Sequence, residues 1–203
     1  GTAHRIRLSQ SWWEIITCDR SAKRHYGDDT ESFRRWSVSQ VCEVLAGERT
    51  YAPGAAERGQ DVHDIFALAV GHYAGLCVEP EVPEQYAGYY CGMQEWIATN
   101  KPHPAQFGIE RMMKHATLPY AGRTDFVGSI GPDFGVLDFK TGAKEKWHLV
   151  QVHGYQKMLD KAAKMWLLYI NAEGAIDFKK VAFDPRHWSG FQNGLSVLQW
   201  REL

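Results

Sequence analysis

In the first half of the chain, apolar residues recur every three or four positions, the spacing of one helix face. A short helix is predicted to begin with a capping box at Ser37 and to end at Gly47. Two longer amphipathic helices are predicted over 56–73 and 86–100. Residues 1–104 are therefore expected to form a mainly helical N-terminal part.

The second half changes to short apolar runs separated by turns, which is typical of strands. Three runs are expected to form an antiparallel meander: 107–117, 121–130 and 135–140. A helix over 147–163 then leads to a continuously apolar run at 165–170, which is typical of a strand buried on both faces. Because this helix crosses over between two strands, those strands can run parallel.

An edge strand over 176–183 and a last helix over 185–200 complete the pattern. The predicted fold class is α/β (α+β), with a mixed central sheet flanked by helices. We expect one domain over 1–203, because no linker or repeat divides it. This domain is expected to consist of a mainly helical part at 1–104, a core of sheet and helix at 105–172, and a C-terminal strand and helix at 173–203.

Composition places the chain among soluble globular proteins. No apolar run approaches the roughly 18 residues of a membrane span, and the polar start with Arg5 and Arg7 does not resemble a secretion signal. We therefore expect no membrane partner and a cytoplasmic location for a bacterial or phage-encoded protein, with a mitochondrial location less favoured. The formal net charge is −1, so any attraction to nucleic acid must be local.

Lysines supply one such local bias, against only Glu145 and Asp160 in the same stretch. Six lysines fall between residues 139 and 164: Lys140, Lys144, Lys146, Lys157, Lys161 and Lys164. The pattern fits a solvated helix face as well as a track for phosphates.

The four cysteines lack the spacing of a metal or redox motif. They are Cys18, Cys42, Cys77 and Cys91. Without a CxxC pair, zinc-ribbon and thioredoxin sites are excluded. Their number leaves disulfides open, but we expect free, mostly buried thiols.

Candidate chemistry lies in the stretch GRTDFVGSIGPDFGVLDFKTG, residues 122–142. Asp125 and Asp138 are equidistant from a turn centred between Gly131 and Pro132. In that register they face each other on one side of a hairpin, whereas a slip of one residue would place them on opposite sides. Two such charges would repel by about 3 kcal/mol.

Protonation, solvent screening or a cation could each relieve this repulsion. We favour a divalent cation, because paired carboxylates with water and phosphate are usual ligands of Mg2+. Lys140 shares a strand face with Asp138 and could stabilise charge on a phosphate, or simply form a salt bridge. Gln151 and Tyr155 share a helix face near this strand, with a surface Gln and half-buried Tyr as the alternative.

Two further residues have open alternatives. His63 lies beside the apolar stripe of the first long helix, where a histidine can be a metal ligand or merely hydrogen-bonded. Glu110 falls within the first strand of the meander. On an inward face it would need a partner, and on the surface it would need none.

Taken together, these residues resemble the motifs of a known family. The motifs run in order as SVSQV (37–41), RGxxVH (58–63), Glu110, GRTDF (122–126), LDFKTG (137–142) and QxxxY (151–155). The series resembles the PD-(D/E)XK nuclease superfamily and, within it, the RecB-like exonuclease branch. It is similar to phage-type and mitochondrial single-strand DNA exonucleases, and it spans about 60% of the chain.

The resemblance implies a restriction-endonuclease-like core and metal-dependent hydrolysis of DNA phosphodiester bonds, as in recombination, repair or phage DNA processing. The implied cofactor is Mg2+ or Mn2+, and the implied metal ligands are His63, Asp125, Asp138 and the Phe139 carbonyl. Lys140 would be the catalytic lysine, supported by Gln151 and Tyr155, with Glu110 at the edge of the site. We expect DNA contacts from Lys144, Lys146, Lys157, Arg58 and Arg123, and consider a recombination or single-strand-binding partner protein.

The sequence also departs from the family pattern. Thr124 stands where many members have proline. No cysteine follows Cys91, so the iron–sulfur cluster of some relatives is not expected. Tryptophans 12, 13 and 36 are candidates for base stacking, and basic residues at 20, 23, 24, 34 and 35 for phosphate contacts. A structure-specific endonuclease and a non-catalytic DNA-binding recombination module are the alternative functions.

Overall fold

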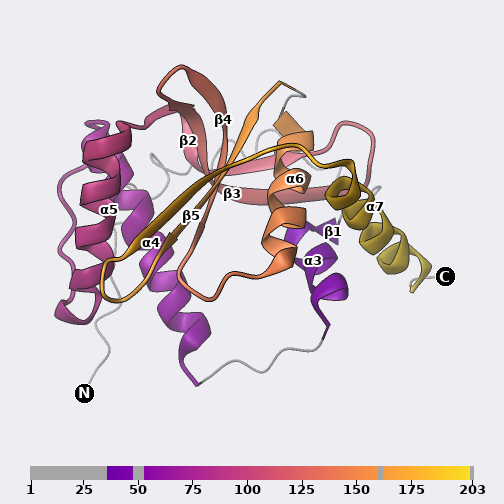
Figure 1. Cartoon of the computed structure of the whole chain (residues 1–203), viewed down its shortest axis with the longest axis horizontal. Coiled ribbons are helices and arrows are strands. Elements are labelled where there is room, and N and C mark those ends of the chain that lie inside the picture. Colours follow the sequence, from indigo (N-terminus) through magenta and orange to yellow (C-terminus); the bar gives the residue numbers. More distant parts are fainter. Residues whose placement is uncertain (1–35, 48–52, 160–161, 202–203) are drawn as a thin grey trace, which may run out of the picture.

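Strands of the second half of the chain and a short strand of the first half form a mixed sheet that is covered by helices on both faces (Figure 1). The structure, a computed structural model, describes residues 36–47, 53–159 and 162–201. The strands are β1 (Trp36–Ser37), β2 (His103–Lys114), β3 (Tyr120–Ile130), β4 (Asp133–Lys140), β5 (Lys164–Ile170) and β6 (Ile176–Val181). The helices are α3 (Val38–Ala46), α4 (Ala55–Tyr73), η2 (Glu84–Tyr86), α5 (Ala87–Asn100), α6 (Lys146–Leu159) and α7 (Pro185–Trp200).

The sheet has the predicted mixed topology. Its order is β1-β3-β4-β5-β6, and β2 also pairs with β3. The β2–β3 and β3–β4 pairs are antiparallel, which confirms the meander. After the crossover through α6, β5 pairs parallel with β4. The predicted fold class, a mixed central sheet flanked by helices, is therefore confirmed.

Two separate apolar cores cover the two faces of the sheet. Helices α4 and α5 pack on one face and α3, α6 and α7 on the other (Figure 1). Strand β5 shows why its sequence is continuously apolar: Trp166, Leu168 and Ile170 enter the first core. Met165, Leu167 and Tyr169 enter the second. A strand covered on both faces has no side on which polar residues are favoured.

Several element boundaries differ from the predicted ones. Strand β2 begins at His103 rather than at 107, because a bulge between Pro104 and Ile109 lets the strand accommodate a proline. The described part of helix α6 extends to Leu159, and Ala162 and Ala163 already lie outside the helix; strand β6 ends at Val181, earlier than predicted. The two-residue strand β1 was not predicted, since so short a segment shows no alternation.

Predictions for the remaining features have different outcomes. Within the described residues, no helix is long and apolar enough to cross a membrane. Cys42 is buried as expected, whereas Cys91 is exposed. The predicted stacking and phosphate contacts at positions 12, 13, 20, 23, 24, 34 and 35 lie outside the described residues, as does Cys18.

Lys101 ends α5 in a left-handed conformation, with φ 47° and its N–H donating to the Ile97 carbonyl. This conformation strains any residue with a Cβ but not glycine. We expect Lys101→Gly to raise the free energy of unfolding by about 0.5–1 kcal/mol in urea titrations. Ala98→Gly, inside the same helix, should lower it by about 1 kcal/mol. A loss of stability in Lys101→Gly would contradict this interpretation of the cap.

His153 is buried between α6 and the start of α7, where Nδ1 donates to the Leu149 carbonyl and Nε2 accepts from the Asp184 N–H. Burial lowers the pKa of His153. Because the unfolded chain then binds a proton first, stability is lost as pH falls below about 6.5. From about pH 7.5 to 5.5, wild type should lose about 1 kcal/mol more than His153→Gln in urea unfolding. Equal losses would show that His153 is not the titrating group; His103→Gln, at an exposed position, is the control.

Candidate active site

A cavity of about 880 Å³ opens where α3, α4 and α6 meet the strands β3 and β4. All seven side chains predicted as catalytic or metal-binding, apart from the Phe139 carbonyl, line it: His63, Glu110, Asp125, Asp138, Lys140, Gln151 and Tyr155. The fold thus brings these side chains together from five elements: α4, β2, β3, β4 and α6.

The hairpin register agrees with the prediction. Strands β3 and β4 pair from Ile130↔Asp133 to Phe126↔Leu137, symmetrically about the predicted turn. One step further along the same register, Asp125 lies opposite Asp138. Both are buried, and both line the cavity. The two acids therefore occupy one face of the hairpin, as that register requires.

Asp125 is held by groups that favour its charged form. Its Oδ1 lies 2.9 Å from His63 Nδ1, and its Oδ2 accepts the Phe139 N–H at 2.6 Å. Burial raises the pKa of Asp125, but His63, Lys140 and the Phe139 N–H outweigh burial and lower it. Because the N–H and C=O of one strand residue point to the same side, the Phe139 carbonyl faces β3 as well.

Glu110 lies beside Asp125 and has an unusual backbone conformation. It follows the β2 bulge and has φ 49°, a left-handed conformation that costs about 1–2 kcal/mol for a residue with a side chain. Its side chain is only 4% exposed, and Arg123 Nε lies 2.9 Å from Oε2. Burial and the nearby charge of Asp125 raise the pKa of Glu110, although Arg123 opposes them. Strain of this kind is typical of functional sites.

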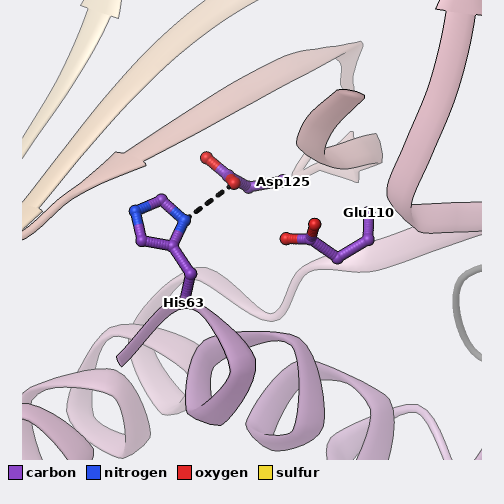
Figure 2. A group of neighbouring side chains, drawn as sticks. All are labelled: His63, Glu110 and Asp125. Atoms are coloured by element: carbon purple, nitrogen blue, oxygen red, sulfur yellow. Dashed lines mark hydrogen bonds and ion pairs between the residues drawn. The ribbon is translucent and has the colours of Figure 1, made fainter. Parts of the chain in front are cut away.

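His63, Glu110 and Asp125 form a candidate metal group (Figure 2). One potential ligand atom from each lies within 4.8 Å of the others. Glu110 Oε1 is buried and has no hydrogen-bond partner among the described residues, so it can accept a cation. These donors fit Mg2+ or Mn2+.

The candidate metal group differs from the predicted ligand set in two residues, and the ligand roles themselves stay predictions. Glu110 was expected at the edge of the site, but it lies inside the candidate metal group. Asp138 was expected among the ligands, yet within the described residues the group is formed without it. The pairs Ile109↔Phe126 and Arg111↔Thr124 on either side of Glu110 place it opposite Asp125, which brings its carboxylate to this group.

Asp138 instead pairs with the lysine two residues further along β4. Lys140 Nζ lies 2.8 Å from Asp138 Oδ2, and the Lys140 side chain is 13% exposed. Nζ also lies 5.5 Å from the centre of the Trp147 ring, which favours a cation. Burial raises the pKa of Asp138 to about 6, against the opposing charge of Lys140. The repulsion between the two neighbouring aspartates is therefore offset by separate partners: His63 and the Phe139 N–H for Asp125, and Lys140 for Asp138.

Gln151 and Tyr155 project from α6 into the same cavity. Both are buried, rather than at the surface or half-exposed as their alternative interpretation had it. Gln151 Nε2 donates to the Tyr155 hydroxyl at 3.2 Å. Burial and then the charges of Asp138 and Asp125 raise the pKa of Tyr155, which keeps the hydroxyl neutral.

Gly122 explains the start of the GRTDF motif. A Cβ at this position would lie 2.7 Å from Val38 Cγ2 and 2.9 Å from Tyr155 Cε1. Glycine thus lets α3 and α6 approach β3 closely enough to close the cavity. Trp147, whose ring centre lies 5.5 Å from Lys140 Nζ, was missed because an aromatic residue at the start of a helix carries no distinctive signal.

The predicted DNA-binding residues are dispersed. Arg123 lines the cavity, but the other four are not among its described lining. Lys144 pairs with Asp177, and Lys157 Nζ lies 4.3 Å from the Phe183 ring centre. The remaining two, Arg58 and Lys146, are exposed. A DNA contact for these residues stays a prediction. Trp36, a stacking candidate, is half-buried at the cavity wall.

Comparison with known proteins finds similarity in structure but none in sequence. No protein-family model matches the chain, and no curated protein matches it in sequence. The chain resembles exonucleases of known structure. It is similar to an alkaline exonuclease from Laribacter hongkongensis (TM-score 0.45, 11% identity, 84% of this chain and 89% of that one).

A second structure of that exonuclease, in complex with dAMP, gives a TM-score of 0.44 at 11% identity, covering 94% of this chain and 85% of the other. A candidate exonuclease from Eubacterium rectale gives 0.48 at 9% identity, covering 88% and 83%. At TM-scores this low the likeness decides nothing about activity, which must be inferred from the chain's own site.

Proposed function

We propose that the protein is a divalent-metal-dependent DNA exonuclease. The observation that carries this proposal is the assembly in one cavity of His63, Glu110 and Asp125 beside the Asp138–Lys140 pair. Acids and an imidazole suited to a cation, next to a buried lysine, suit hydrolysis of a phosphodiester. DNA as substrate and attack from an end follow from the resemblance of the ordered motifs.

The side chains divide into two roles. His63, Glu110 and Asp125 would hold the cation, with Asp138 and the Phe139 carbonyl beside it. A bound cation supplies a Lewis acid for the phosphoryl oxygen and a water of lowered pKa. Lys140 is oriented by Asp138 and places its positive charge where charge develops on the phosphate.

Three further residues of the cavity wall have proposed supporting roles: Gln151 and Tyr155 on α6, and Trp36. Tyr155 and Gln151 hydrogen-bond to each other on the wall of the cavity that the two aspartates also line. The half-buried Trp36 offers a ring against which a base could stack. Stacking does not depend on sequence, which suits an enzyme that digests strands of any sequence.

The test is release of nucleotides from DNA under defined cation conditions. End-labelled linear single-stranded and double-stranded DNA and circular single-stranded DNA are incubated with Mg2+, Mn2+ or EDTA. We expect cation-dependent mononucleotide release from linear DNA and none from the circle. Cutting of the circle would indicate an endonuclease instead. Binding without cleavage of any substrate would leave a DNA-binding module and refute the catalytic proposal.

A further inference from the structure

Arg123 makes a contact that a simple phosphate-binding residue would not need. Its Nε holds Oε2 of the buried Glu110 at 2.9 Å, yet 44% of the Arg123 side chain is exposed at the cavity. Glu110 keeps a strained φ of 49° and leaves Oε1 for another partner. Arg123 therefore connects a buried member of the candidate metal group with the open side of the cavity.

The chemistry of guanidinium makes this connection specific. Arginine carries several N–H donors in a rigid fork, so Nε can bind one oxyanion while the terminal nitrogens bind a second. Lysine has one ammonium nitrogen on a flexible chain, and it cannot hold two anions in fixed relative positions. Arg123 and Asp125 are two residues apart on β3, so their side chains point to the same face of the strand, and both line the cavity.

Building on the proposed function, we propose that Arg123 is a positioning residue that bridges Glu110 to a backbone phosphate of the substrate strand. Nε fixes the carboxylate, and the terminal guanidinium nitrogens receive the phosphate. Strand binding then holds Glu110 in the position that the cation requires, and the cation holds Arg123 ready for the strand. The two ligands are coupled through one side chain, and such coupling acts equally in both directions.

The experiment measures Mn2+ affinity by calorimetry, with and without a saturating single-stranded DNA 12-mer. All proteins carry Lys140→Met to suppress cleavage, and Arg123, Arg123→Lys and Arg123→Gln are compared. With Arg123 intact, we expect the 12-mer to tighten Mn2+ binding by about tenfold. In Arg123→Lys this factor should fall to about threefold or less, although the charge is retained.

A second readout separates positioning from folding. The salt dependence of 12-mer binding should lose about 0.7 of its log–log slope in Arg123→Gln, the contribution of one phosphate contact to a single strand. Arg111→Gln is the matched control, because Arg111 carries the same charge on the neighbouring strand β2 but does not line the cavity. It should leave the coupling factor and the slope unchanged.

The outcomes distinguish this inference from the proposed function. If Mn2+ and the 12-mer both bind but the coupling factor is the same with Arg, Lys and Gln at position 123, the bridging role is overturned and the nuclease site stands. An unchanged salt slope in Arg123→Gln overturns it as well. If the parent protein binds neither Mn2+ nor the 12-mer, the proposed function fails together with the inference.

Discussion

Replacement of Lys140 by methionine is expected to lower kcat for DNA cleavage by about a thousandfold. Lys140 is nearly buried, pairs with Asp138 at 2.8 Å, and contacts the Trp147 ring. Methionine fills a similar volume but carries no charge, so stabilisation of the developing phosphate charge is lost while packing is retained. Loss of one preorganised electrostatic group in a site screened from water commonly has an effect of this size.

Single-turnover cleavage of a labelled oligonucleotide under saturating Mn2+ measures this loss directly. Circular dichroism and thermal unfolding check that the variant folds. Lys179→Met is the matched control, because Lys179 pairs with Asp177 on β6 and does not line the cavity. Cleavage by Lys140→Met within a factor of three of wild type would remove Lys140 from the catalytic machinery.

The second large effect is expected for Asp125→Asn, which should weaken Mn2+ binding by about a hundredfold or more and abolish measurable cleavage. Asparagine keeps the shape and can still accept the Phe139 N–H that Asp125 binds at 2.6 Å. It loses the negative charge that the candidate metal group needs, and it cannot chelate a hard cation as well as a carboxylate can.

Calorimetric Mn2+ titration and the cleavage assay should fail together in this variant. Asp133→Asn is the control, since Asp133 lies at the other end of the same hairpin and pairs with Lys180 on the surface. Normal Mn2+ affinity in Asp125→Asn would show that the cation is held elsewhere. Normal affinity with lost cleavage would assign Asp125 a role other than metal binding.

The order of elements and the hairpin register could be predicted from sequence because each rests on local signals. A continuously apolar run gives β5, and the Gly131–Pro132 turn fixes which residues of β3 and β4 are opposite. That register places Asp125 and Asp138 on one face. Alternation along a regular strand then places Lys140 beside Asp138.

The position of Glu110 could not be predicted in the same way. Strands β2 and β3 are joined by a longer connection than the tight turn between β3 and β4, so the sequence does not show which residue of β3 lies opposite Glu110. Its partner Arg123 lies 13 residues away on β3, and the pair forms only when the meander closes. Contacts of this kind depend on tertiary packing, which leaves no periodic trace in the sequence.

The burial of the site residues on α6 was also beyond prediction from the sequence. Gln151 reads as a surface residue because it is polar, but it is buried against Tyr155. A polar side chain is buried without a large cost only where it finds a hydrogen-bond partner. Here the partner is Tyr155, a residue type that occurs both in the interior and at the surface. Sequence reasoning could link the two by their spacing, but not assign them to the interior.

The central claim is that His63, Glu110 and Asp125 hold a divalent cation beside the Asp138–Lys140 pair. The most direct measurement is anomalous diffraction at the manganese edge from crystals of the protein soaked in Mn2+. We expect an anomalous peak within about 2.0–2.5 Å of oxygen or nitrogen atoms of these three side chains. A peak elsewhere, or no peak in a crystal whose cavity is open to solvent, would contradict the claim.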